Sequence, residues 1–445
     1  MSNSYDVALI GAGAAGLAAA RELSQAGLRV AMVEARDRIG GRIYTLHPPE
    51  LQYPIELGAE FIHGTPAHTR DLLETSGLTP YEVPDDHWMF EKNKIRKIRD
   101  FWKRIDRALQ DIDPRAERDV SFRQYVASSL RLKLFRKDRK LAQAFVEGFN
   151  AAAQDRISVH SLISHSGLME ALDVTRVFRI SQGYDQLLHW IWNQTADPAC
   201  SVLLNTPIQE IRWEKGAVEI IPVDPTQDKI TAKQVIITLP ISVLSLTESD
   251  RGFVRFTPAI PEKREAASWL EMGPVMKIAL QLNHVLWEEL GLTRFNFIHA
   301  PMEDSAFPTW WNAAPFRVPL LTGWAGGPAA TALSGRSEEE MLELALVSLS
   351  RVFSIAKTTL ARAVEHTYFY DWQSDPYSRG AYSYICVGGH GSSQDLARPV
   401  ENTLFFAGEA TLVEGLSGTV DGALATGRRA AREVILSQET RAKAA

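Results

Sequence analysis

A glycine-rich turn near the N-terminus limits most strongly the folds open to this chain. Residues 6–10 are apolar β-formers, Gly11-Ala12-Gly13-Ala14-Ala15-Gly16 follows, and residues 17–26 have the composition of a helix. Gly27 and a second apolar run over 28–33 complete a strand–turn–helix–strand unit. This context makes the GxGxxG pattern a credible dinucleotide-binding turn and predicts an α/β fold with a Rossmann-like domain.

The three glycines of the pattern have different roles in such a unit. Gly11 permits the tight turn, Gly13 lets a pyrophosphate approach the backbone, and Gly16 lets the helix pack closely against the strand. The free N–H groups at the helix N-terminus then favour phosphate. Glu34, at the end of the second strand, can accept hydrogen bonds from ribose hydroxyls and disfavours a 2′-phosphate. FAD or NAD therefore fits better than NADP, and an unliganded glycine loop is the alternative.

Segments farther along the chain help to decide between FAD and NAD as the bound dinucleotide. Gly40-Gly41-Arg42 can bring flexible backbone and a guanidinium back to the phosphates, and residues 56–64 read Glu-Leu-Gly-Ala-Glu-Phe-Ile-His-Gly. Near the C-terminus an apolar run over 404–407 leads into Gly408-Glu409-Ala410-Thr411, and residues 417–423 open a helix expected to run over 424–435. A second helix N-terminus beside a cofactor suits the negative charge of a reduced flavin. Taken alone, this distal segment could equally be a structural βα unit.

In this chain order the motifs resemble those of the flavin-containing amine oxidases, the family of monoamine oxidases, polyamine oxidases and flavin histone demethylases. The resemblance is greatest to a soluble, bacterial-type polyamine or amine oxidase, and it implies FAD. Ala381 occupies the position where monoamine oxidases carry the cysteine that binds flavin, so FAD is expected to be non-covalent. The cofactor contacts that the resemblance implies are Gly11, Gly13, Ala15, Gly16, Glu34, Ala35, Arg36, Gly41, Arg42, Gly58, Ala59, Glu60, Ile208, Trp372, Gly408, Glu409, Gly418, Thr419 and Val420.

Lys277 is the first of four candidate catalytic residues. It interrupts the apolar run 274–280, which reads as a strand, and a buried lysine needs a polar partner. The resemblance implies that this lysine holds a water next to flavin N5 and assists reoxidation by O2. Read from the residues alone, an edge-strand lysine that reaches back to solvent is the alternative.

The other three candidate catalytic residues are Trp372, Tyr382 and His63, and their roles come from the resemblance. Trp372 is expected near the dimethylbenzene edge of the flavin, and Tyr382 as one wall of an aromatic amine cage. Thr419 stands where monoamine oxidases carry the second aromatic wall, which favours the polyamine oxidase and demethylase branches. His63 is expected on the substrate passage or as a structural histidine. Glu60 is a candidate partner for a distal ammonium, or a turn residue.

Two interleaved domains are expected from the order of these segments. The FAD-binding domain takes residues 1–80, 181–273 and 395–445, and an α+β substrate-binding domain takes 81–180 and 274–394, with a helical part at about 95–172. Aromatic residues in the second region could line an amine pocket. Within the FAD domain, residues 202–220 read as a hairpin that turns at Lys215-Gly216, and 235–239 as a buried strand.

The expected function is that of an FAD-dependent amine oxidase. Hydride passes from the amine α-carbon to flavin N5, the imine hydrolyses, and O2 is reduced to H2O2. A polyamine or another aliphatic amine is favoured as the substrate. The alternatives are a primary monoamine oxidase, an L-amino-acid oxidase or another oxidoreductase on the same fold, and a flavin-binding protein without turnover is the least favoured. The amine itself and the oligomeric state stay open.

Charge and cysteine content narrow the partners further. The formal net charge is −6, which gives no general attraction to nucleic acid or membrane surfaces. The locally basic segment 131–140 reads as a solvated helix face, with a phosphate-binding patch as the alternative. Cys200 and Cys386 form no metal-ligand or disulfide pattern, so neither a metal site nor a disulfide is expected. A cytoplasmic enzyme that meets a small amine and O2 fits these features.

Overall fold

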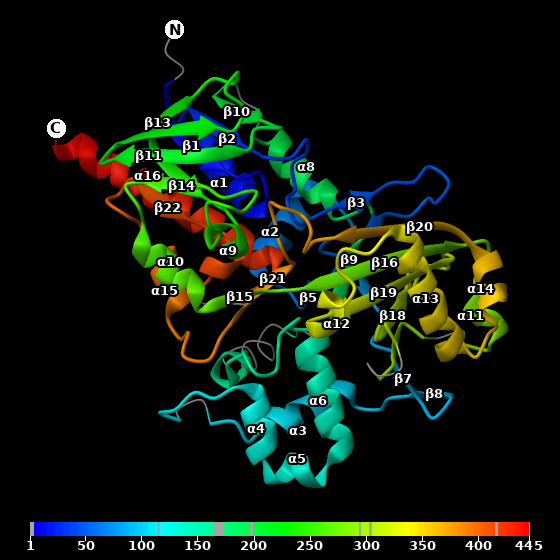
Figure 1. The fold of residues 1–445 in the computed structure, drawn as a ribbon. Helices are drawn as coiled ribbons and strands as arrows, with labels where there is room; N and C mark the ends of the chain where they lie inside the picture. The colour runs from blue at the N-terminus through cyan, green and yellow to red at the C-terminus, as the bar shows by residue number, and fades with distance from the viewer. Residues whose placement is uncertain are drawn as a thin grey trace.

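The computed structural model describes residues 4–113, 116–163, 173, 175–195, 199–292, 295–301, 305–413 and 417–444. Two large sheets lie apart from each other, and a group of helices extends away from both (Figure 1). The predicted α/β class is confirmed, with helices packed on a largely parallel sheet at one end and a mixed sheet at the other. The domain boundaries expected from the sequence remain a prediction.

The first large sheet contains the glycine turn. Its eight strands follow the order β10-β2-β1-β13-β12-β11-β14, with β22 paired to β13, and β1 is parallel to both β2 and β13. The buried residues of the central strands β1, β2 and β13 are nearly all apolar, as expected for the interior of such a sheet. The strands are β1 (Ser4–Ile10), β2 (Val30–Val33), β10 (Cys200–Leu203), β11 (Ile208–Glu214), β12 (Ala217–Pro222), β13 (Ile230–Ile237), β14 (Arg255–Thr257) and β22 (Leu404–Phe406).

Two helices that begin at the predicted motifs pack against each other beside this sheet. They are α1 (Ala14–Gln25) and α16 (Val420–Ala444), and α16 begins before and ends after the range 424–435 expected for it. A Cβ on Gly427 would lie 2.1 Å from the carbonyl oxygen of Ala15, so only glycine allows the helices to approach this closely. The remaining helices near the sheet are α2 (Ala67–Ser76), α8 (Asp185–Asn193), α9 (Ile241–Leu244), α10 (Pro261–Ser268) and α15 (Ser392–Ala397).

The second large sheet carries Lys277 on an interior strand. Its order is β20-β16-β19-β18-β17-β7-β8, with β16 paired to β20 on one side and to β19 on the other. Lys277 is 2% exposed, which excludes the alternative of an edge-strand lysine that reaches solvent. The strands are β7 (His87–Glu91), β8 (Lys94–Lys97), β16 (Val275–Leu282), β17 (Phe297–His299), β18 (Thr309–Asn312), β19 (Leu320–Gly326) and β20 (Val364–Asp371).

The two faces of this sheet have different neighbours. Met276, Ile278 and Leu280 point to a hydrophobic core shared with α13 (Glu338–Phe353) and α14 (Lys357–Ala363). Lys277 alternates with them and therefore points to the opposite face. Helices α11 (Leu286–Glu289) and α12 (Pro328–Thr331) join the core on the α13 side. The remaining short strands are β3 (Thr45–Leu46), β4 (Ile55–Glu56), β5 (Ile62–His63), β6 (Pro80–Val83), β9 (Val177–Ile180), β15 (Leu270–Gly273) and β21 (Tyr382–Ile385).

The predicted helical part is present, although its first residues form strand β8. Its helices are α3 (Phe101–Leu109), α4 (Phe122–Ser128), α5 (Leu130–Leu134) and α6 (Arg136–Gly148), which pack around a core of their own. Residues 164–172 lie outside the described part of the chain.

Three features bear on the expectations about partners. Cys200 and Cys386 are both free and buried. Among the described residues, no group of three or more His, Cys, Asp or Glu side chains is arranged to hold a metal ion. In the same part of the chain no single helix combines the length and apolarity of a membrane span. Helices α13 and α14, bent by 117°, reach those limits only when taken together.

Candidate active site

One continuous cavity of about 2010 Å³ connects the glycine turn of the first sheet with the aromatic face of the second. Nearly all the residues predicted from the sequence line it, although they come from segments spread along the chain. The exception among the predicted residues is Gly16. A Cβ on Gly16 would lie 2.0 Å from the carbonyl oxygen of Gly11, so this glycine serves the packing of α1 against the turn.

The turn itself is closed by contacts that only glycine permits. Gly11 has a φ of +102°, and a Cβ there would lie 2.5 Å from the hydroxyl oxygen of Thr238. That hydroxyl donates to the carbonyl oxygen of Ile10 at 2.7 Å and so joins β13 to the turn. The geometry fixes the backbone from which α1 begins.

Gly13 differs from Gly11 because the space beside it is open. Its backbone is extended, and the nearest atom to a Cβ at this position would be the Cα of Gly41, 4.0 Å away. Gly13 is the N-cap of α1 and makes no side-chain capping hydrogen bond, so the first N–H groups of the helix keep their donor capacity toward the cavity. These features match what a pyrophosphate requires of a helix N-terminus.

Glu34 and Arg36 form the end of the cavity next to β2. The carboxylate of Glu34 accepts hydrogen bonds from the backbone N–H groups of Ala12 at 2.8 Å and Arg36 at 2.9 Å. The Arg36 guanidinium donates to Asp375 at 2.7 Å and to the hydroxyl of Ser378 at 2.8 Å. Glu34 is therefore fixed in place on the cavity wall, whereas Arg36 links this wall to the loop after β20.

A buried hydrogen-bond network surrounds Glu409. Its carboxylate accepts from Nη1 of Arg42 at 2.8 Å and from the hydroxyl of Ser383 at 2.6 Å. The same Arg42 nitrogen also donates to the carbonyl oxygen of Ala381 at 2.6 Å. Arg42 and Glu409, which the resemblance assigns to the cofactor, thus also hold the two ends of the chain together at the cavity.

These residues fit FAD. Open space beside Gly13, uncapped N–H groups on α1, a fixed carboxylate at Glu34 and a cavity that continues past Gly58 and Ala59 suit an elongated dinucleotide. The start of α16 reaches the same cavity at Val420. Ala381 provides no nucleophile for a covalent flavin bond, so non-covalent binding of FAD remains a prediction.

Lys277 belongs to a buried group of charges. Its Nζ lies 2.5 Å from Oε2 of Glu60, and Oε1 of Glu60 accepts from Nε1 of Trp311 at 3.0 Å. Oε1 of Glu60 also lies 2.7 Å from Nε of Arg179. Burial acts to raise the pKa of Glu60, but Lys277 and Arg179 outweigh it and hold that pKa below its usual range. Both Glu60 oxygens are engaged, so the structure does not favour the role of partner for a distal ammonium, which was one of the two roles suggested by the sequence.

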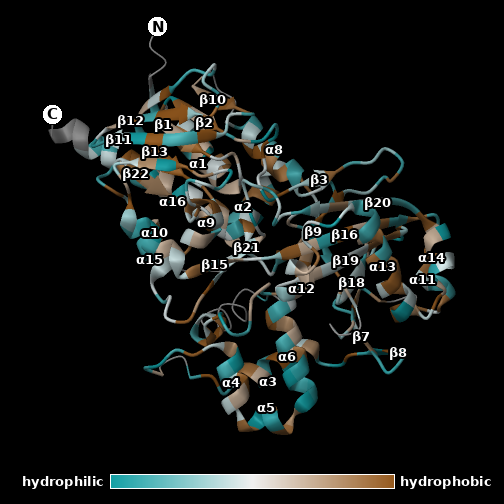
Figure 2. Cartoon of the chain, in the orientation of Figure 1, coloured by the Kyte–Doolittle hydropathy of each residue, from teal (hydrophilic) through white to brown (hydrophobic). Residues whose placement is uncertain are grey.

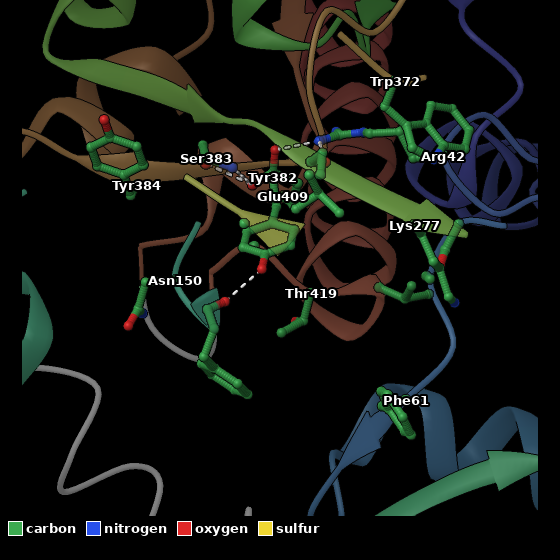
Figure 3. A pocket seen from close by; sticks show the side chains of 18 of the residues that line it. Arg42, Phe61, Asn150, Lys277, Trp372, Tyr382, Ser383, Tyr384, Glu409 and Thr419 are labelled. Atoms are coloured by element: carbon green, nitrogen blue, oxygen red, sulfur yellow. Dashed lines mark hydrogen bonds and ion pairs between the residues drawn. The ribbon is translucent and has the colours of Figure 1, made fainter. Parts of the chain in front are cut away.

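Tyr382 projects into the pocket opposite Lys277 (Figure 3). Its hydroxyl donates to the carbonyl oxygen of Phe149 at 2.5 Å, which ties β21 to the end of α6. A Cβ on Gly418 would lie 3.5 Å from the Tyr382 ring, and Thr419 reaches the same pocket. Trp372 is 2% exposed and donates from Nε1 to the carbonyl oxygen of Leu57 at 2.8 Å.

His63 is half-buried, and one of its ring nitrogens is buried without a hydrogen-bond partner. Its Nδ1 makes no hydrogen bond, and its ring lies edge-on to Phe149 with centroids 5.3 Å apart. Burial lowers the pKa of His63 to about 4, so the imidazole is neutral at physiological pH. Because unsatisfied buried polar atoms are rare, a ligand group is a natural partner for this nitrogen.

The floor of the pocket is one face of the second sheet. Lys277, Trp324, Thr309 and His299 are direct neighbours on four successive strands. All four line the cavity. The cavity therefore extends from Lys277 across four strands of the sheet. The aromatic side chains that line this part are Phe61, Phe101, Trp102, Phe149, Phe297, Trp311, Trp324 and Tyr382.

Sequence reasoning missed Arg179 and the carbonyl of Phe149. Arg179 is 3% exposed on β9 and donates to the carbonyl oxygens of Asn312 and Ala314, in addition to its ion pair with Glu60. The signal available was the one used for Lys277, a single charge in an apolar strand. The role of Phe149 depends on its backbone, which no sequence pattern reports.

The fold and the cavity define a flavoprotein of the oxidoreductase class, with a dinucleotide site and an enclosed aromatic pocket joined in one space. Residues 14–435 match the model of the flavin-containing amine oxidoreductases, and the chain belongs to that family. This membership confirms the predictions of an oxidoreductase and of FAD.

Several known proteins are similar to the chain over nearly its whole length. It is 29% identical to polyamine oxidase 4 of Oryza sativa subsp. japonica, over 96% of the chain and 88% of that protein. It is 24% identical to human lysine-specific histone demethylase 2, over 96% of the chain but only 53% of that protein, so it spans about half of the demethylase.

Solved structures show the same fold. Putrescine oxidase, in a structure with bound putrescine, superposes with a TM-score of 0.80 at 22% identity, over 97% of this chain and 99% of that one. Cyclohexylamine oxidase from Brevibacterium oxydans gives a TM-score of 0.80 at 22% identity, over 98% and 99% of the two chains.

Proposed function

We propose that this protein is an FAD-dependent amine oxidase. When bound, FAD supplies the acceptor for a hydride from the carbon beside the amine nitrogen and the route by which the electrons reach O2, which leaves as H2O2. The resulting imine is released to water and hydrolyses. The observation that carries the proposal is the single cavity that joins the glycine turn to the aromatic pocket, with Lys277 between them.

The pocket favours the neutral form of the amine, from which hydride is lost. Its aromatic walls cannot solvate an ammonium ion well, so binding lowers the pKa of the substrate nitrogen. Tyr382 supplies one wall, and its ring is held by the hydrogen bond to Phe149. Burial raises the pKa of the Tyr382 phenol far above its usual value, so the hydroxyl stays protonated and keeps that hydrogen bond.

Two polar groups position the substrate and solvent. The unpartnered Nδ1 of neutral His63 can donate or accept a hydrogen bond and so orient a polar group of the substrate. Nζ of Lys277 donates a hydrogen bond to the carboxylate of Glu60. Nζ also donates to the carbonyl oxygen of Gly58 at 3.4 Å, and its remaining donor capacity can hold a water molecule or stabilise negative charge that arises in the pocket.

The substrate class proposed is a polyamine or another aliphatic amine. The names of polyamine oxidase 4 and putrescine oxidase, which this chain resembles, favour it. Thr419 supports it, since a small side chain opposite Tyr382 leaves the amine pocket with one aromatic wall there. Because Glu60 is engaged by Lys277 and Arg179, recognition rests on pocket shape and aromatic contacts more than on a carboxylate near the reacting carbon.

A substrate panel tests the proposal. The purified protein is given aliphatic monoamines, diamines, polyamines and L-amino acids, and both H2O2 and the aldehyde product are measured. H2O2 is expected with aliphatic amines, in equal amount to the aldehyde. Turnover of L-amino acids alone would show that the protein is an oxidase but that the proposed substrate class is wrong. If no amine is turned over, the proposed amine oxidase activity is wrong.

A further inference from the structure

Three large apolar side chains are exposed on α5 and at the turn that leads from it to α6. Leu130 is 76% exposed, Leu134 79% and Phe135 55%, and the two leucines are the most exposed large apolar residues in the described part of the chain. We call these three residues the α5 tip. They lie at the end of the helical part that is farthest from the first sheet (Figure 1).

The tip is built by the sequence of α5 itself. Leu130 and Leu134 are four residues apart and share one helix face, whereas Leu132 between them is fully buried in the helical core. In Figure 2 hydrophobic and hydrophilic colours lie side by side at α5, as its alternating leucines and basic residues require. The short helix therefore anchors itself through Leu132 and leaves the two other leucines outside the fold.

Positive charge surrounds the tip. Residues 129–140 contain six basic residues and a single acidic one, Asp138, whose carboxylate is already bound by Arg104 at 2.8 Å. Arg131 pairs with Asp111, while Lys133, Arg136, Lys137 and Lys140 are exposed. This local excess contrasts with the formal net charge of −6 for the whole chain.

We infer that the α5 tip docks on an anionic lipid surface. An apolar knob encircled by lysines and arginines is the arrangement with which proteins enter the headgroup layer, since the apolar groups insert and the cations remain among the phosphates. Three side chains are too few for a stable protein interface, which needs about 800 Å² from each partner. A second copy of the same tip would also bring like charges together.

Docking in this way would orient the molecule. Lys137, Arg139 and Lys140 of α6 line the large cavity and also follow the tip directly in the sequence. A membrane that held the tip would thus lie next to that part of the cavity. The inference does not depend on the proposed oxidase activity, because it rests on the surface of the helical part alone.

Vesicle sedimentation tests the inference with the full-length protein. Binding to phosphatidylcholine vesicles is compared with binding to mixed phosphatidylcholine–phosphatidylglycerol vesicles. Both are measured for the parent protein and for the double variants Leu130→Ser/Leu134→Ser and Lys133→Glu/Arg136→Glu. The control is Val347→Ser, which changes a side chain 49% exposed on α13, away from the tip. We expect the parent protein and the control to bind the anionic vesicles at least about tenfold better than the neutral ones, and added salt to weaken binding.

Each double variant is expected to lose at least about four-fifths of that binding, with unchanged circular dichroism. Equal sedimentation with both vesicle types, or binding that survives loss of the two leucines, would overturn the inference. The same holds if the leucine variant changes the oligomeric mass in solution and no variant binds vesicles, because the tip would then be a subunit contact. Binding to nucleic acid but not to vesicles would likewise overturn it.

Discussion

Lys277 and Glu60 form a buried ion pair across 217 residues of sequence, with Nζ and Oε2 2.5 Å apart. Arg179 approaches the other oxygen of the same carboxylate at 2.7 Å. The group therefore carries two positive charges and one negative charge next to the aromatic pocket. Isolated charges are costly inside a protein, and their retention here points to a use in the chemistry of the site.

Replacement of Lys277 by Met should slow reoxidation by O2 at least about tenfold, which corresponds to about 1.4 kcal/mol, while FAD stays bound. The positive charge on Nζ is lost, and Arg179 still neutralises Glu60. Stopped-flow absorbance after mixing the reduced protein with O2 measures the rate. The matched control is Lys263→Met, since Lys263 is also 2% exposed but bonds to backbone carbonyls near α15. Equal reoxidation rates in the two variants would show that Lys277 has no specific role in the reaction with O2.

Glu56 gives the protein a pH-dependent stability. Burial raises the pKa of this carboxyl to about 8 in the folded protein, against 4.5 as its ordinary value. The folded state therefore binds more protons than the unfolded state between these values, and stability falls as pH rises through that window. Glu56→Gln removes the titration and keeps an acceptor for the N–H of Tyr184.

The melting temperature of Glu56→Gln should therefore exceed that of the parent protein by about 2 °C or more at about pH 9, with a smaller difference at about pH 5. Differential scanning calorimetry at both pH values measures it. An equal shift of the melting temperature at both pH values would show that the substitution does not act through the charge of Glu56.

Gly13→Ala and Gly16→Ala separate cofactor binding from folding. The space beside Gly13 is open for 4.0 Å, so Gly13→Ala should fold normally and lose FAD affinity about tenfold or more, because its methyl group enters the cofactor cavity. At Gly16 a Cβ would lie 2.0 Å from the carbonyl oxygen of Gly11, so Gly16→Ala should lower the melting temperature of the apoprotein itself. FAD titration and thermal unfolding of both apoproteins measure this. A stable, FAD-saturated Gly13→Ala protein would contradict the placement of the pyrophosphate.

Features of the fold and the site that depend on a short stretch of sequence could be predicted, whereas features that depend on distant segments could not. The glycine turn, Glu34 and the strand of Lys277 are local patterns, because each fixes its own backbone or stands out in an apolar run. The partner of Lys277 was not predictable. Glu60 comes from a distant segment, and its pairing with Arg179 depends on how β9 and the second sheet are placed.

The end of α16 shows a second limit. Residues 436–444 are mostly polar and were not expected in the helix, but they continue it because the preceding turns pack against α1. Tertiary contacts thus extend α16 into a segment whose composition alone does not predict a helix. The reverse holds at residues 94–97, where pairing with β7 makes a strand of a segment expected to begin the helical part.

Acid denaturation tests the state of the cofactor. Ala381 offers no thiol, so precipitation with acid should release all the flavin into the supernatant as intact FAD. Absorbance of the supernatant and of the redissolved pellet measures the partition. Flavin that stays with the pellet through repeated washing would show a covalent bond to another residue and refute the prediction.

Anaerobic titration with an aliphatic amine tests whether the bound flavin oxidises amines. The yellow absorbance of the purified protein should bleach in proportion to the amine added, and admission of O2 should restore it with one H2O2 formed per amine oxidised. Bleaching by the Lys263→Met control together with slow recovery in Lys277→Met would support both halves of the account. If no amine bleaches the protein while dithionite does, the protein binds flavin without oxidising amines, and the account is wrong.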